Sequence, residues 1–143
     1  MVYAPKVSEP ARPAHRHISL ILARDLASHL ASAILLVDPE GNLVYFNEAA
    51  ERILGRPYAE AQMDRAQLAK TFKPVDEAGE PVPIRDLPLA QAFRSGFPSH
   101  GYLRIEAVDG ETRDIEVIGL PLFATADQLV GGLAVFWERI EEV

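Results

Sequence analysis

Apolar residues recur at a spacing of four near the start of the chain, at Ile18, Leu22, Leu26 and Leu30. Polar residues separate them, and this spacing brings the apolar side chains onto one face of a helix. The pattern predicts an amphipathic leading helix over residues 18–30. Its apolar stripe needs a cover, which is either the outer face of a sheet or the same helix of a second copy of the chain.

Two short apolar runs follow, over residues 33–37 and 43–46, with a proline and a glycine in the connection between them. Such runs are typical of the two strands of a β-hairpin. Asn47 stands directly after the second run, where its side-chain oxygen can accept a free N–H group of a following helix. The sequence therefore predicts Asn47 as a helix cap, and Gly55 is expected to end that helix.

The middle of the chain carries weaker signals. Short helices are expected around residues 59–63 and 66–70, before a stretch rich in proline and glycine. A clearer helix follows over residues 86–95. Asp86 is its candidate cap, and Gly96 is expected to end it.

The last third of the chain alternates between apolar and polar residues, as half-buried strands do. The alternation covers residues 103–107 and 114–117, and Asp109 with Gly110 between them is a strong hairpin signal. A further apolar run over residues 130–137 predicts the closing strand. Two strands, several short helices and three more strands favour an α+β fold, with one antiparallel sheet and the short helices packed on one face.

The domain organisation follows from length and composition. A chain of 143 residues with 48% hydrophobic content has enough apolar side chain for one buried core. Residues 1–17 contain three prolines and little periodicity, so we expect an extended arm outside that core. We therefore predict the arm over residues 1–17, the leading helix over residues 18–30 and a single domain over residues 31–143.

Charge and composition exclude several classes of function. The chain carries 14 Lys and Arg against 21 Asp and Glu, a net charge of −7, which disfavours direct binding of nucleic acids and of anionic membranes. No apolar run approaches the roughly 20 residues that span a bilayer, and no signal peptide precedes the domain, so the predicted location is the cytoplasm. The chain has no cysteine, which excludes disulfides, thiolate metal sites and thiol nucleophiles.

Several segments in order resemble the PAS domain family, over roughly residues 28–140. They are the hairpin and capped helix LASAILLVDPEGNLVYFNEAAERILG at 30–55, the approach DEAGEPVP at 76–83 with the helix DLPLAQAFRSG at 86–96, and the closing run LVGGLAVFWE at 129–138. The Asp-Ile-Thr that often follows the last strand in this family is replaced here by Glu138, Arg139 and Ile140.

The resemblance implies a sensory module with a five-stranded antiparallel sheet in the order 2-1-5-4-3, whose helices enclose a pocket against one sheet face. The candidate pocket residues are Phe46, Ile53, Leu89, Phe93, Leu103, Ile105, Ile115, Val117 and Val135. Either a small-molecule ligand occupies this pocket or these side chains fill the space themselves. The sequence leaves that choice open.

Cofactors of the family can be tested against individual residues. A photoactive flavin member needs an adduct-forming cysteine, and the matching stretch at 62–70 has none, so cysteinyl-flavin photochemistry is excluded while passive flavin binding stays open. Haem members place an axial His on the long helix, and residues 86–95 contain neither His nor Met, which disfavours haem. His100 is expected to be solvated or hydrogen-bonded. No metal site is predicted, because His15 and His17 lie on the arm without the further ligands that zinc needs.

The chain is not expected to be an enzyme, because no Ser, His and Asp set has the spacing of a nucleophile and its base. An enzyme on a similar fold would need acidic or His groups inside the pocket.

The two ends of the domain are the expected route of a signal. In PAS proteins the leading helix often packs as a dimer and the last strand runs into an output segment. The resemblance therefore assigns dimer contacts and signal relay to Ile18, Leu22, Leu26, Leu30, Trp137 and Glu138.

Two hypotheses of function follow. The first is a ligand-binding sensor that works as a homodimer and regulates a signalling partner or a fused output domain, such as a two-component kinase or a transcription regulator. The alternative is a PAS domain with a filled core that serves only protein–protein association.

Overall fold

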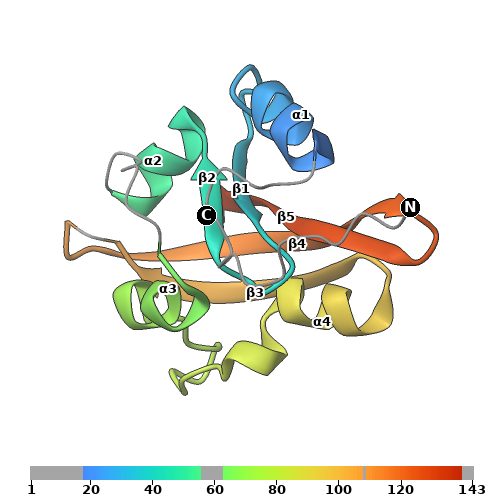
Figure 1. The fold of residues 1–143 in the computed structure, drawn as a ribbon. Coiled ribbons are helices and arrows are strands. Elements are labelled where there is room, and N and C mark those ends of the chain that lie inside the picture. The colour runs from blue at the N-terminus through green and yellow to red at the C-terminus, as the bar shows by residue number, and fades with distance from the viewer. Residues whose placement is uncertain (1–17, 56–62, 108, 140–143) are drawn as a thin grey trace, which may run out of the picture.

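The computed structural model describes residues 18–55, 63–107 and 109–139. Its five strands form one antiparallel sheet in the order β2-β1-β5-β4-β3, as predicted (Figure 1). The strands are β1 (Ala33–Val37), β2 (Leu43–Phe46), β3 (Ser99–Glu106), β4 (Thr112–Thr125) and β5 (Gln128–Glu138).

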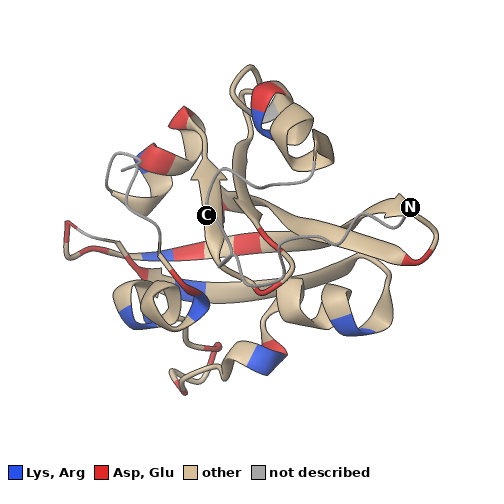
Figure 2. Cartoon of the chain, viewed as in Figure 1, with Lys and Arg blue, Asp and Glu red and all other residues tan. Residues whose placement is uncertain are grey.

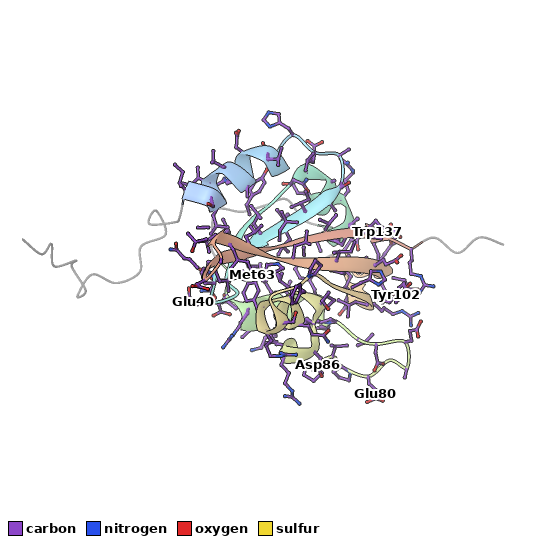
Figure 3. The ribbon with its side chains drawn as sticks, turned by 90° about the vertical axis from the view of Figure 1, so that its right-hand side faces the viewer. Glu40, Met63, Glu80, Asp86, Tyr102 and Trp137 are labelled. Carbon is purple, nitrogen blue, oxygen red and sulfur yellow. The ribbon has the colours of Figure 1, made fainter. Side chains whose placement is uncertain are left out.

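Helices cover both faces of this sheet. They are α1 (Ile18–Ala27), α2 (Glu48–Leu54), α3 (Arg65–Phe72), the 3-10 helix η1 (Ile84–Asp86) and α4 (Pro88–Ser95). Residues of α2 and α3 share the larger buried core with inward side chains of the strands, whereas α1 packs into a smaller cluster on the opposite face. Figure 3 shows α1 on one side of β4 and β5 and α4 on the other.

Helix α1 lies on the outer face of its own sheet, but through a different stripe from the predicted one. Leu20 is 2% exposed and packs with Leu36 and Val44. The predicted stripe stays exposed, at 64% for Ile18, 62% for Leu22 and 62% for Leu26. Residues two positions apart point to nearly opposite sides of an α-helix. Ile18 and Leu22 therefore face solvent when Leu20 faces the sheet.

The leading helix is shorter than predicted, because it ends at Ala27 and leaves Leu30 outside it with 43% of its surface exposed. The hydroxyl of Ser28 donates to the carbonyl of Asp25 at 2.7 Å, and a ring nitrogen of His29 lies 2.8 Å from the same oxygen. Both contacts occupy the carbonyl oxygen of Asp25 in the last turn, and side-chain bonds of this kind favour termination of the helix there.

The expected cap of α2 is present. Asn47 Oδ1 accepts the backbone N–H of Ala50 at 3.1 Å, and Gly55 ends the helix in the left-handed conformation with φ of 78°. The same Asn47 oxygen accepts the N–H of Ile34 at 3.0 Å, so this side chain also fixes the start of β1.

The expected cap of α4 is wrong. Asp86 belongs to η1, and the residue before α4 is Leu87, which makes no side-chain capping bond. Pro88 occupies the first turn, where a missing N–H costs nothing and its fixed φ suits a helix, so the helix starts without a polar cap. Gly96 ends it as predicted, with φ of 78°.

Helix α3 corresponds to the helix expected at 66–70, and Asp64 directly before it forms a capping box with Gln67. The other short helix, expected at 59–63, lies mostly outside the described residues. The β3–β4 hairpin turns through Asp109 and Gly110, as expected. Among the described residues, no helix is long and apolar enough to cross a membrane.

Candidate ligand pocket

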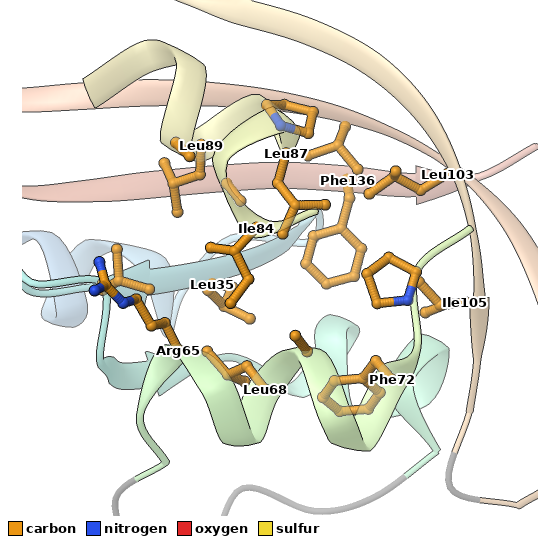
Figure 4. A pocket seen from close by; sticks show the side chains of 18 of the residues that line it. Leu35, Arg65, Leu68, Phe72, Ile84, Leu87, Leu89, Leu103, Ile105 and Phe136 are labelled. Carbon is orange, nitrogen blue, oxygen red and sulfur yellow. The ribbon is translucent and has the colours of Figure 1, made fainter. Parts of the chain in front are cut away.

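A cavity of about 240 Å³ lies between the inner face of the sheet and the helices α3, η1 and α4 (Figure 4). Strand side chains form one wall, and Leu68 and Phe72 of α3 face them. Ile84 of η1, Leu87 between η1 and α4, and residues of α4 complete the wall. The wall is apolar almost throughout, which suits an apolar molecule.

Most of the predicted pocket residues lie on this wall. They are Leu89, Phe93, Leu103, Ile105, Ile115 and Val117. Leu89 and Phe93 share one face of α4, and the other four lie on β3 and β4, where the alternation of apolar and polar residues identifies the inner face.

Three of the predicted residues do not line the cavity. Phe46 is buried in the adjoining core and Ile53 packs against that core, while Leu54 is the residue of α2 that reaches the wall. Val135 is on the wrong face of β5, because Ala134 and Phe136 line the cavity and successive side chains of a strand point to opposite sides.

Sequence reasoning missed one side of the wall, formed by Leu35, Val37, Ala134 and Phe136. Strand β1 reads AILLV and is apolar on both faces, so it has no alternation that could identify the inner side chains. In β5, Phe136 lines the cavity and the neighbouring Trp137 is exposed, an alternation that the run LVGGLAVFW at 129–137 does not reveal by itself.

Glycines let α4 lie directly on the sheet. A β-carbon on Gly132 of β5 would meet the ring of Phe93, and it would lie 2.8 Å from Leu89 Cδ1. A β-carbon on Gly119 of β4 would lie 2.8 Å from the backbone of Leu89. Both distances are too short for carbon atoms that do not bond, so the absence of these side chains fixes how closely the helix covers the pocket.

Two charged side chains line the cavity, Glu40 from the β1–β2 turn and Arg65 from the first turn of α3. The aliphatic stem of Arg65 packs over Gly41, since a β-carbon built there would lie 3.4 Å from Arg65 Cδ. Within the described part of the chain, the guanidinium of Arg65 has no hydrogen bond or ion pair.

The carboxyl groups of β4 with shifted pKa values point away from the cavity. Arg104 Nε donates to Asp114 Oδ1 at 2.7 Å, and this hydrogen bond lowers the pKa of Asp114. His100 Nε2 lies 2.8 Å from Glu116 Oε2, and this hydrogen bond is the main cause of the lowered pKa of Glu116. Because the neighbouring Ile115 lines the cavity, both carboxyls belong to the outer face of the sheet.

Metal ligation finds no support in the part of the chain that the structure describes, where no three His, Asp or Glu side chains gather. His100 is paired with Glu116 on the outer face, and His15 and His17 lie outside the described residues. Helix α4 brings Leu89, Ala90 and Phe93 to the cavity, none of which ligates iron.

An antiparallel sheet with a helix-covered apolar cavity on one face defines this chain as an α+β domain with a single sheet. A family model described as the PAS domain matches residues 31–138, and the chain belongs to this family. No curated protein sequence matches the chain.

Solved PAS structures share the fold at low sequence identity. The PAS domain of a protein from Colwellia psychrerythraea has a TM-score of 0.58 at 18% identity, over 85% of this chain and 97% of that chain. The PAS domain of BvgS from Bordetella pertussis has a TM-score of 0.55 at 18% identity, over 86% and 87%. The PAS domain of nitrogen regulation protein NR(II) from Vibrio parahaemolyticus has a TM-score of 0.58 at 19% identity, over 82% and 98%.

Proposed function

We propose that this PAS domain is a sensor that binds a small molecule in the apolar pocket and relays its presence through dimer contacts to a regulatory partner. The observation that carries the proposal is the cavity of about 240 Å³ on the inner face of the sheet. Sites for small molecules are concave and mostly apolar, with a few polar groups that orient the ligand. A cavity of this size therefore favours ligand binding over the alternative of a filled core that serves only association.

Strand β5 supports the relay because it touches the pocket and α1 at once. Ala134 and Phe136 line the cavity from this strand. Gly131 of the same strand lies under α1, since a β-carbon there would stand 2.7 Å from Leu20 Cδ2. A ligand that shifts β5 therefore acts on α1 directly, and also on Trp137 and Glu138 at the end of the strand.

Homodimerisation is proposed from the surface of α1. The helix presents Ile18, Ile21, Leu22 and Leu26 to solvent while Leu20 holds it on the sheet. Exposed apolar side chains gathered on one helix face are typical of an interface. A second copy of the same helix would cover them with an identical stripe.

The partner class is proposed from the relatives. BvgS and the nitrogen regulation protein NR(II) each contain a PAS domain of this fold. We infer a bacterial-type signalling partner or a fused output domain, such as a two-component kinase or a transcription regulator, acting in the cytoplasm. The role is binding rather than catalysis, which the apolar wall supports.

The test fills the pocket and measures binding. Native mass spectrometry of the purified protein, with a denatured control, reports retained small molecules and the oligomeric state. Calorimetric titration with toluene then probes the cavity, because an apolar cavity of about 150 Å³ is known to bind benzene. Ala134→Leu and Ala90→Leu place extra carbon atoms in the cavity and should abolish toluene binding, whereas the exposed Ala78→Leu should not. A wild-type protein that retains no small molecule and takes up no toluene would contradict the proposal.

A further inference from the structure

We propose that the pocket selects small molecules with an apolar body and a carboxylate, and that Arg65 binds the carboxylate. This inference rests on the proposed function, because it names the ligand class of the same pocket. It starts from the contrast between an apolar wall and two charged side chains, Glu40 and Arg65.

The wall determines the body of the ligand. Leucine, isoleucine, valine, phenylalanine, alanine and proline make up nearly all of it, and a polar group buried there without a hydrogen bond costs free energy. A volume of about 240 Å³ exceeds that of a cavity known to hold benzene, yet it lies below the range of roughly 300–1,000 Å³ usual for drug-sized ligands. A single ring or a short alkyl chain fits these limits.

Arg65 is held at the cavity wall by its surroundings. It opens α3, and the capping box of Asp64 and Gln67, with Gln67 N donating to Asp64 Oδ1 at 2.8 Å, fixes that end of the helix. Its stem lies against Gly41, with Cδ 3.4 Å and Cβ 3.5 Å from the position of a β-carbon there. Figure 4 shows the side chain at one end of the pocket, next to Leu68 and Leu35.

The free guanidinium determines the polar group of the ligand. Its planar set of N–H donors matches a carboxylate in a bidentate geometry, and hydrogen bonds between charged groups are stronger than those between neutral ones. Within the described residues no acidic side chain competes for it through a hydrogen bond or ion pair. The carboxylate of a ligand whose body lies in the cavity would find this partner at the cavity wall.

The helices that cover the pocket carry more basic than acidic residues, although Asp64, Asp86 and Glu40 lie beside them and the chain has a net charge of −7. Helices α3 and α4 carry Arg65, Lys70 and Arg94 and no acidic residue. The ribbon in Figure 2 is blue, the colour of Lys and Arg, at positions on α3 and α4. This distribution raises the local concentration of anions at the pocket.

The carboxylate of Glu40 would favour a cationic group on the ligand, so the test must distinguish binding through Arg65 from binding through Glu40. Four variants are titrated by calorimetry, Arg65→Gln, Arg65→Lys, Glu40→Gln and the matched control Lys70→Gln on the same helix. The probes are 3-phenylpropanoate, 3-phenylpropanamide and 3-phenylpropylamine, which share one apolar body. In the wild type we expect the carboxylate to bind about tenfold or more tightly than the amide, as one charge-assisted pair allows. Arg65→Gln should remove this preference and leave the affinity for the amide unchanged, Arg65→Lys should retain part of it, and Lys70→Gln should retain it.

The other outcomes overturn the inference in distinguishable ways. Equal binding of the carboxylate and the amide, both blocked by Ala134→Leu, would refute carboxylate selection and leave the ligand pocket standing. Preference for the amine that disappears in Glu40→Gln would assign the polar group to Glu40 instead. Failure of all three probes and of toluene to bind to a protein that retains no small molecule would refute both this inference and the proposed function.

Discussion

The ring of Phe93 in α4 occupies the space where a side chain on Gly132 of β5 would project. This contact joins the helix that covers the pocket to the central strand of the sheet. Strand β5 carries Gly131 and Gly132 in succession, so one glycine receives Leu20 of α1 and the next receives Phe93 of α4 from the opposite face. The two helices on opposite sides of the sheet therefore depend on the same short segment.

Gly132→Ala should push α4 away from the sheet. The new methyl group overlaps Phe93 and Leu89, and overpacking of this kind costs about 1–3 kcal/mol of the free energy of unfolding. Urea denaturation measures this cost. The double variant Gly132→Ala with Phe93→Leu should recover part of the loss, because the shorter side chain leaves room for the methyl group. If the loss in the double variant equals the sum of the losses in the two single variants, the contact between residue 132 and Phe93 is not the cause of the destabilisation.

Asn47→Ala should destabilise the fold far more than removal of an ordinary helix cap. Asn47 is 1% exposed, its Oδ1 accepts the N–H groups of Ile34 and Ala50, and its Nδ2 donates to Ser32 O at 2.8 Å. Buried groups left without partners cost about 1–3 kcal/mol each, so we expect a loss of about 3 kcal/mol.

The matched control for Asn47 is Asp64→Ala, which removes the exposed cap of α3. A loss of only about 0.5–1 kcal/mol is expected there. Equal losses in the two variants, measured by urea denaturation, would contradict the wider role of Asn47. Asn47→Asp should keep the cap and lose the bond to Ser32, so its stability should fall between the wild type and Asn47→Ala.

Glu116 should make stability depend on pH in the acidic range. Its hydrogen bond with His100 lowers its pKa from an ordinary value of 4.5, and Trp137 Nε1 also donates to its Oε1 at 3.2 Å. Because folding lowers this pKa, the unfolded chain binds the proton more tightly. The stabilisation from Glu116 is therefore full above pH 4.5 and is lost as the pH falls through the folded pKa.

Glu116→Gln provides the comparison. Its amide oxygen can still accept the Trp137 bond but carries no charge, so the difference in unfolding free energy between wild type and variant should shrink as the pH is lowered. Trp137 is the one tryptophan in the chain, so its fluorescence follows the same group directly. A difference that stays constant from neutral to acidic pH would contradict the assignment.

Two leucines of α1 should separate stability from self-association. Leu20→Ala removes a buried side chain and should cost about 2–5 kcal/mol of the free energy of unfolding. Leu22→Glu changes an exposed position and should leave that free energy nearly unchanged.

The same Leu22→Glu variant should raise the dissociation constant of a dimer by more than about tenfold, since it places a charge in an apolar interface. Analytical ultracentrifugation over a concentration series measures this. If the wild-type protein stays monomeric at high concentration, the proposed homodimer through α1 is wrong.

The sequence by itself determined the elements and their order, because the signals for them are local. Asn47, Gly55 and Gly96 act through hydrogen bonds and backbone conformations within a few residues, and the Asp109-Gly110 turn sets its own hairpin. Alternation on β3 and β4 likewise identified the inner residues Leu103, Ile105, Ile115 and Val117. The order of these elements favoured one antiparallel sheet, and the resemblance to the PAS family supplied the strand order 2-1-5-4-3.

Only the tertiary structure determined which face of each helix and strand is buried and which lines the pocket. Strand β1 is apolar on both sides, so its assignment of Leu35 and Val37 to the pocket depends on what packs against each face. Helix α1 has apolar residues around much of its surface, and Leu20 is the buried one, in the place that the missing side chain of Gly131 leaves open. The volume of the cavity and the place of Arg65 beside it arise from contacts between segments far apart in the chain, which no local pattern encodes.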